Sequence, residues 1–469
     1  MRENRDGASG ANFVSSRERA SCPPYIVSMY RATDVQASPG LGLTVFATAS
    51  VSLIAVLFLT NWPTYHYTVR GGPLALYYYL VPSVLIVPLL CAEPRLAVKF
   101  LKEPLFWWFV IYVLSGLLWL LLAQDFQEDA DHQWRLRLVA FSFFYTITIF
   151  TATARRSWVG LVILACVALA CALNWFDVLR PERIVPKGVI VGIDQAGSGR
   201  GAGTFIDANS GAAFIVMGTI AALPFVPRSL RGLLFVAAII GVAPAYSRSG
   251  YVLVAVAALG AIGLRLLSWR QGIALIVGIP LLAAAIGLSY DFLLEHTENK
   301  NLHLVMQRLS WFEDHDIEDA AVEGRKYGAT VAWNMFLENP LLGRGTGATS
   351  REVLMEEPHN VYLALMAEQG IFGLALYVSL VGILARRGWR LYRTAVSRHG
   401  QEAGQVMVLF AFFLATYGVF IHNVLKEPYT LFVLAFIVAM GFEAARLERH
   451  HIATHMAYRG RIAGTGAAL

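Results

Sequence analysis

Long runs of apolar residues, separated by short strings of charged ones, constrain this chain more than any other feature. Of its 469 residues, 57% are hydrophobic and only 15% are charged, whereas a soluble domain carries about 25% charged residues. The apolar runs are about 17–25 residues long, which is the length that crosses a bilayer as a helix. Because helices satisfy their own backbone hydrogen bonds in lipid, the sequence predicts an all-α polytopic membrane protein.

The apolar runs predict about 12 transmembrane helices. The expected spans are approximately 41–60, 72–92, 104–123, 136–153, 157–175, 210–227, 231–246, 250–267, 271–289, 360–384, 405–424 and 428–446. They divide the chain into a disordered tail (1–38), helices 1–9 (39–289), a large helical loop domain between helices 9 and 10 (290–359), helices 10–12 (360–446) and a second tail (447–469). Pro244 falls inside a run and should kink it or unwind it.

The distribution of basic residues predicts the orientation. Most lysines and arginines of the short loops fall on the side of the N-terminus, and the opposite short loops hold only Arg70, Arg135, Arg137, Arg248 and Lys426. Because positive loops stay in the cytosol, both tails should be cytosolic, and the loops 176–209 and 290–359 should face the periplasm of a bacterial inner membrane. This topology also explains the net charge of +6, so nucleic acid is not an expected partner.

Residues 197–209 form the first unusual segment on the predicted outer side. Glycines and small residues surround Arg200 there, and the amides of such a flexible chain can approach phosphate oxygens. As a nucleotide motif the segment is poor, because no strand precedes it and no Gly-Lys-Ser/Thr follows. Asp207 or Asn209 has a second interpretation as the cap of the next helix.

Arg248 lies in a short turn between two predicted spans, flanked by Ser247 and Ser249. An arginine near the hydrocarbon boundary either snorkels to water or binds an anion. Its position on the side that disfavours positive charge favours anion binding.

The large loop carries an acidic stretch at 313–319. It resembles a metal cluster, but a helix N-terminus capped by Asp316 is the simpler interpretation. That helix should run to about Glu338 and present Ala329, Trp333 and Phe336 on one face. The four cysteines show no pattern of a disulfide or a zinc site, so neither metal nor cofactor is expected.

Three further cations belong to the same loop. Arg325 and Lys326 should lie on the predicted helix, facing the membrane opening, and Arg344 stands in the glycine-rich turn 343–347 that follows it.

His359 opens the tenth predicted span and should sit at the water boundary, where an imidazole exchanges protons near neutral pH. Asn360 and Tyr362 follow it directly, and Glu368 comes nine residues later. Glu368 should therefore lie roughly 13 Å deeper on another face of the helix, too far to orient His359. Its expected role is structural, with Gly370 and Gly373 admitting a neighbouring helix.

Together these segments resemble the O-antigen ligase and O-antigen polymerase superfamily of bacterial envelope glycosyltransferases. The resemblance covers about residues 197–375 and rests on Arg200 with Gly203-Thr204-Phe205 and Asn209, on Ser247-Arg248-Ser249-Gly250, on Trp333 to Pro340-Leu341-Leu342-Gly343 and Gly345, and on His359-Asn360 with Leu363, Glu368, Gly370 and Gly373. Family members often have Asn-Pro-Asn where this chain has Asp207-Ala208-Asn209, which leaves the role of Asp207 open.

The resemblance implies a ligase, because the late loop is about twice as long as the earlier one. Such an enzyme moves a glycan from undecaprenyl pyrophosphate to a sugar hydroxyl of lipid A–core, without metal or nucleotide. The implied site has His359 and Arg248 as catalytic residues, with pyrophosphate-binding and supporting residues around them: Arg200, Arg248, Arg325, Lys326 and Arg344, then Asn209, Asn360, Tyr362 and Glu368.

Several alternatives stay open at this point. A polymerase or a protein O-oligosaccharyltransferase would share the motifs. A flippase for lipid-linked sugars, or a non-catalytic lipid-binding scaffold, would also use a basic membrane cavity. Activity that survives His359→Ala would favour one of the last two.

Overall fold

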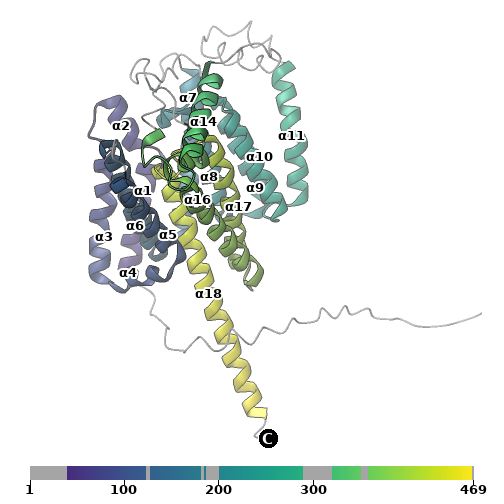
Figure 1. Ribbon diagram of the computed structural model, residues 1–469. Coiled ribbons are helices and arrows are strands. Elements are labelled where there is room, and N and C mark those ends of the chain that lie inside the picture. Colours follow the sequence, from purple (N-terminus) through teal and green to yellow (C-terminus); the bar gives the residue numbers. More distant parts are fainter. Residues whose placement is uncertain are drawn as a thin grey trace, which may run out of the picture. The chain divides into compact units, whose positions relative to one another are not determined.

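The computed structural model describes residues 40–122, 127–180, 184–185, 200–288, 320–349 and 358–466. These residues form fifteen α-helices, and no strand occurs among them. The α-helices shown in Figure 1 are α1 (Leu41–Leu59), α2 (Trp62–Arg70), α3 (Leu80–Ala92), α4 (Arg95–Lys99), α5 (Pro104–Leu122), α6 (Gln127–Thr153), α7 (Arg156–Leu179), α8 (Ala208–Ala222), α9 (Arg231–Val242), α10 (Arg248–Gly263), α11 (Trp269–Leu288), α14 (Ala320–Glu338), α16 (Val361–Thr394), α17 (Arg398–Phe420) and α18 (Pro428–Gly466). Short 3-10 helices join some of them: η2 (Ala75–Tyr79), η3 (Phe100–Lys102), η5 (Gly203–Phe205), η6 (Leu223–Phe225), η7 (Arg228–Leu230) and η8 (Ala243–Ala245).

Every predicted span falls on a helix, in some cases together with a flanking 3-10 turn. Within the described ranges, ten segments have both the length and the composition needed to cross a membrane. The remaining two predicted spans fall on α10, which is apolar but has 16 residues, and on α11, which has 20. The prediction of an all-α polytopic membrane protein is confirmed, and the number of about twelve spans stays a prediction.

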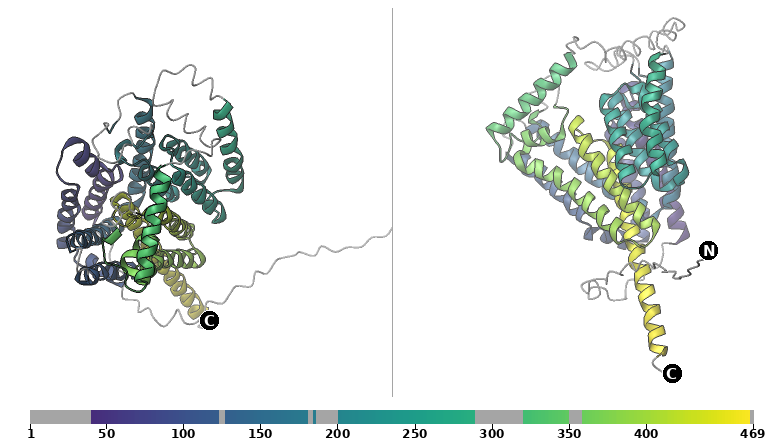
Figure 2. Two further views of the ribbon diagram at one scale, coloured as in Figure 1. Left: turned by 45° about the horizontal axis from the view of Figure 1, so that its top comes forward. Right: turned by 90° about the vertical axis from the view of Figure 1, so that its right-hand side faces the viewer.

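The inner helices of the bundle are α8, α17 and α18. In their candidate spans 83%, 72% and 83% of the residues are buried, and α18 packs against both α8 and α17. Small residues permit this density, since a Cβ at Gly218 of α8 would lie 2.5 Å from a methyl group of Val167 on α7. At 1.5 Å per residue α18 is roughly 58 Å long, and its C-terminal part extends beyond the other helices (Figures 1 and 2).

Helix α14 packs on α16 (Figures 1 and 2), which confirms a helix in the late loop. The predicted packing face was wrong. The buried residues of α14 include Ala332 and Met335, at 0% and 2% exposure, whereas Trp333 is 45% exposed. The pattern of apolar residues predicted the helix correctly. It placed the buried face one residue too far along the chain, because it counted Trp333 as buried, and a large aromatic side chain can remain on the surface. Asp316 and the acidic stretch 313–319 lie outside the described residues.

A kink at Gly370 divides α16, because the φ of 61° and ψ of −151° at this residue are non-helical. The turn after α14 supplies partners for the backbone groups that the kink releases. The amide of Gly345 donates to the carbonyl of Glu368 at 3.0 Å, and the amide of Ile371 donates to the carbonyl of Pro340 at 2.9 Å.

The two glycines of this kinked stretch admit a different neighbour from the one predicted. A Cβ at Gly370 would collide with the backbone of Leu341, and a Cβ at Gly373 would collide with the carbonyl of Leu365 in the same helix. The neighbour that approaches Gly370 is therefore the turn at 340–345, and not another helix.

Two ends of the bundle can be distinguished by the helix termini. The His359 end is where α8, α10, α16 and α18 begin and α17 finishes, and the Glu402 end is where α9 and α17 begin. The 23 residues of α17 separate the two ends by roughly 34 Å.

Candidate functional site

Asp207 and Asn209 stand at the start of α8 with different roles. The Asp207 carboxylate accepts from the amides of Asn209 and Ser210 at 3.2 and 2.9 Å, so Asp207 is the N-cap that the capping interpretation predicted. The side-chain oxygen of Asn209 instead accepts from the Arg200 guanidinium at 2.7 Å and from the Ser247 hydroxyl at 2.7 Å. Asn209 therefore joins the two arginine-bearing segments that the sequence singled out.

Arg200 and its neighbour Gly201 are further fixed by η8, the 3-10 turn that precedes α10. The Arg200 Nε donates to the carbonyl of Ala245 at 2.8 Å, and the amide of Gly201 donates to the carbonyl of Pro244 at 2.7 Å. Pro244 does interrupt its apolar run, as expected, by turning the end of α9 into η8. The chain then passes through Tyr246, whose φ of 43° is left-handed.

Arg248 is the first residue of α10. Ser247 caps this helix by accepting from the amide of Gly250 at 3.0 Å, and its hydroxyl also lies 2.9 Å from that of Ser249. The Arg248 side chain is exposed. The serines on both sides of Arg248 thus fix the backbone turn that presents the guanidinium at the surface of the His359 end.

His359 is half-buried immediately before α16. Asn360 caps that helix by accepting from the amides of Tyr362 and Leu363 at 2.9 and 3.1 Å. The Tyr362 hydroxyl donates to the carbonyl of Ala415 on α17 at 2.8 Å. Asn360 and Tyr362 therefore position the backbone beside His359 and hold α16 against α17.

The turn between α17 and α18 contributes residues that sequence reasoning missed. The ring of His422 lies 5.8 Å from that of His359 in an edge-to-face arrangement. Asn423 donates a hydrogen bond to the Glu427 carboxylate, and burial together with the Asp207 carboxylate raises the pKa of Glu427 to about 7. This turn links the Asp207 side of the site to the His359 side. The signal in the sequence was a pair of polar dipeptides, His422-Asn423 and Lys426-Glu427, within the seven-residue loop 421–427.

Arg137, counted in the sequence only as an outer-loop charge, is a buried residue of α6 with 5% exposure. Its guanidinium donates to the Tyr112 carbonyl and the Ser115 hydroxyl, each at 3.2 Å, and its central carbon lies 4.5 Å from the centre of the Tyr112 ring. With its side-chain amide oriented to suit these donors, Gln369 accepts from both terminal nitrogens at 2.7 and 2.5 Å. Arg137 lines a cavity together with Glu368, His422 and other residues.

The remaining predicted cations lie on or after α14. Arg325 and Lys326 are exposed. Arg344 forms an ion pair with Glu338, the last residue of α14. Glu368 is 8% exposed, and its carboxylate accepts from the Thr349 hydroxyl at 2.7 Å. The structure thus brings Arg200, Asn209 and Ser247 together, and pairs His359 with His422.

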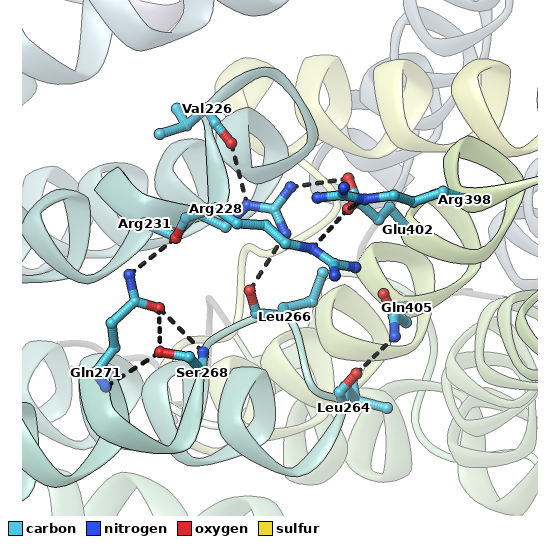
Figure 3. A network of polar contacts seen from close by, with 10 residues as sticks. All are labelled: Val226, Arg228, Arg231, Leu264, Leu266, Ser268, Gln271, Arg398, Glu402 and Gln405. Atoms are coloured by element: carbon cyan, nitrogen blue, oxygen red, sulfur yellow. Dashed lines mark hydrogen bonds and ion pairs between the residues drawn. The ribbon is translucent and has the colours of Figure 1, made fainter.

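The Glu402 end contains none of the predicted site residues. Figure 3 shows that its centre is the Glu402 carboxylate, which binds Arg231 at 2.8 Å, Arg228 at 3.1 Å and Arg398 at 3.0 Å. Arg231 is 1% exposed, and its other nitrogens donate to the carbonyls of Val226 and Leu266. This network fastens η7 and α9 to α17.

A metal site was not expected, and within the ranges that the structure describes no group of three or more His, Cys, Asp or Glu side chains is placed to hold a metal ion. The acidic stretch 313–319 is not part of those ranges.

The fold defines a polytopic membrane protein whose His359 end carries Arg200 bound to Asn209 and the ring pair of His359 and His422. Residues 233–378 match the model of a family described as O-antigen ligase, which confirms the predicted resemblance to that family. The matched stretch runs from α9 into α16 and includes Arg248 and His359, whereas Arg200 and Asn209 precede it. The comparison with curated proteins gives no match.

Proposed function

We propose that this chain is an O-antigen ligase of the bacterial inner membrane. It would move a glycan from undecaprenyl pyrophosphate to a sugar hydroxyl of lipid A–core at the periplasmic face, with both termini in the cytosol. The observation that carries the proposal is the bridge made by Asn209, which joins Arg200 to the segment of Arg248 at the end of the bundle where His359 also lies.

The two arginines suit a pyrophosphate. A guanidinium keeps its proton in any physiological condition and binds phosphate oxygens through two parallel hydrogen bonds. The contacts of Arg200 with the Ala245 carbonyl and Asn209 fix its orientation before substrate binds, and a preorganised donor stabilises a developing charge without reorganisation. We assign the pyrophosphate first to Arg200 and Arg248.

The cations of the late loop come second in this assignment. Arg325 and Lys326 are exposed on α14 and would meet the distal part of a long lipid-linked substrate. Arg344 is engaged with Glu338, and that carboxylate offsets its charge.

His359 is the proposed base. The acceptor hydroxyl oxygen forms a bond to the anomeric carbon of the donor, and the bond from that carbon to the pyrophosphate oxygen breaks. The hydroxyl proton passes to His359, and undecaprenyl pyrophosphate leaves with its charge stabilised by the arginines. The donor bond supplies the driving force, so the proposed reaction needs no nucleotide, and the proposal assigns the charge of the leaving pyrophosphate to the arginines in place of a metal.

The test combines purified full-length protein in lipid nanodiscs with the lipid-linked glycan and lipid A–core, without nucleotide and with a metal chelator present. Glycan on the core would support a ligase. Longer lipid-linked chains would identify a polymerase, and glycan on a protein acceptor would identify an oligosaccharyltransferase. The absence of every product, with the substrates intact, would overturn the enzymatic proposal.

A pair of histidine variants sharpens this test. We expect His359→Ala to abolish transfer while the circular dichroism of the helices is unchanged. The matched control is His132→Ala, because His132 is an exposed residue of α6 at the same end and should leave transfer unchanged. Transfer at the wild-type rate by His359→Ala would exclude His359 as the base.

A further inference from the structure

We propose that the last turns of α16, at the Glu402 end of the bundle, bind the headgroup of an anionic phospholipid. The site is a set of four exposed side chains, which we call the arginine stripe: Arg386, Trp389, Arg390 and Arg393. Because this end would face the cytosol in the proposed orientation, the lipid would belong to the inner leaflet. The inference does not depend on the proposed reaction, whose residues lie at the His359 end.

The four residues of the arginine stripe share one face of α16. At 100° per residue their positions fall within a sector of roughly 100°. The opposite face is packed against the bundle, since Leu384, Gly388 and Leu391 are buried. The arginine stripe therefore forms one continuous surface that points away from the protein core.

The charges of the stripe are not offset by carboxylates of the protein. Among the residues that the structure describes, no ion pair includes an arginine of the stripe. Glu103 binds the neighbouring Arg387, and the buried carboxylates of Glu402, Glu443 and Glu448 have contacts of their own. Like charges one turn apart destabilise a helix, so an anion bound along the stripe would relieve this repulsion.

Trp389 orients one arginine and suits the level of lipid headgroups. The Arg393 guanidinium lies over the Trp389 ring, 5.8 Å from its centre, and an aromatic face attracts a cation in this position. The indole is 49% exposed. Tryptophan is enriched at the membrane–water interface, where its apolar body meets lipid and its N–H group meets headgroups. The stripe thus has the composition of a headgroup site.

The same face of α16 is apolar on the side toward the middle of the helix. Phe372 and Val378 are 56% and 51% exposed, and a Cβ at Gly382 would meet open space. Val378 lies eight residues before Arg386, or roughly 12 Å along the axis, which is within the roughly 15 Å of hydrocarbon in one leaflet. A ligand for this face must join an anionic group to apolar chains, as a phospholipid does. A nucleic acid or a soluble anion would meet only the cationic part.

The test compares two triple variants of the full-length protein that have the same net charge. The stripe variant replaces the three arginines of the stripe: Arg386→Gln, Arg390→Gln and Arg393→Gln. The control variant replaces three exposed cations dispersed over the same end, on α4, before α7 and on α11: Arg95→Gln, Arg155→Gln and Arg270→Gln. The measurement is the Kd for phosphatidylglycerol and for the neutral phosphatidylcholine, by native mass spectrometry of the protein in detergent.

We expect the stripe variant to bind phosphatidylglycerol about a hundredfold more weakly than the wild-type protein, since each basic residue at a membrane surface contributes roughly fivefold. The control variant should keep the wild-type affinity, and all three proteins should bind phosphatidylcholine equally. Equal losses in both triple variants would overturn the inference, because the attraction would then belong to the whole positive end. Unchanged affinity in both, or equal binding of the two lipids by the wild-type protein, would overturn it too.

A single variant, Arg390→Gln, keeps the test decisive if the stripe variant does not fold. Removing the middle arginine lowers the repulsion between like charges, so this variant should unfold in phosphatidylcholine nanodiscs at the wild-type temperature or above it. We expect it to lose roughly fivefold in affinity for phosphatidylglycerol. The full wild-type affinity in this folded variant would overturn the inference.

Discussion

The two ends of the helix bundle hold their arginines in different ways. At the Glu402 end a single buried carboxylate binds Arg228, Arg231 and Arg398. At the His359 end the contacts of Arg200 include the side-chain amide of Asn209 and the backbone carbonyl of Ala245, and Arg137 contacts a carbonyl, a hydroxyl and an amide.

We propose that these arginines have a structural role at the Glu402 end and a substrate-binding role at the His359 end. A carboxylate in contact with a guanidinium offsets its charge and fastens helices together. A neutral oxygen orients the guanidinium and leaves its positive charge to act on a substrate. The Glu338–Arg344 pair shows that the His359 end contains the first arrangement too, so the contrast applies to individual arginines and not to whole surfaces.

The largest effect should come from Glu402→Ala, which tests the structural side of the comparison. Removing this carboxylate leaves Arg231, at 1% exposure, without its ionic partner, and breaking a buried ion pair costs about 3–5 kcal/mol. We expect a correspondingly lower free energy of unfolding in detergent, with transfer per folded molecule unchanged. Arg398→Ala is the control, because its side chain is 63% exposed and surface pairs contribute at most about 1 kcal/mol. Wild-type stability of Glu402→Ala would contradict the structural role.

The second largest effect should come from Arg248→Ala, which tests the functional side. Losing one contact to the transition-state pyrophosphate should cost about 3–4 kcal/mol, or a few hundredfold in kcat. The thermal unfolding of the variant should resemble that of the wild-type protein, because the exposed Arg248 side chain stands at the surface of α10. A variant that transfers at the wild-type rate would show that the arrangement at Ser247 serves only to begin the helix.

The smallest effect concerns pH and the turn that links the two sides of the site. The pKa of Glu427 is raised from 4.5 to about 7, so folding favours its protonated form. This contribution to stability is fully present below pH 4.5 and is lost as the pH rises through about 7. We expect the unfolding midpoint of the wild-type protein to fall between pH 5 and pH 8, relative to that of Glu427→Gln measured at the same pH values. Parallel pH profiles of the two proteins would contradict the raised pKa of Glu427.

Much of the fold followed from local properties of the sequence. Runs of apolar residues gave the helical segments, and Asp207 was identified as a possible cap because capping depends on amides two and three residues away. The face of α14 could not be predicted in this way. Its buried residues are chosen by contacts with α16, and those depend on how the turn after α14 docks at the kink of Gly370.

The site shows the same division between local and long-range information. The sequence identified Arg200, Arg248 and His359 as unusual for their positions. It gave no reason to associate Arg137 with Glu368 or His422 with His359, because these residues come from different helices and turns.

By itself, the sequence determined that this chain forms membrane-spanning helices and which of its polar residues stand at their ends, since hydropathy and capping act within a few residues along the chain. Only the tertiary structure decided which partners each arginine contacts. Arg231 meets Glu402 across 171 positions of the sequence, and Ser247 meets Asn209 across 38. Such pairs depend on how whole helices pack against one another, and this packing cannot be predicted from local sequence patterns.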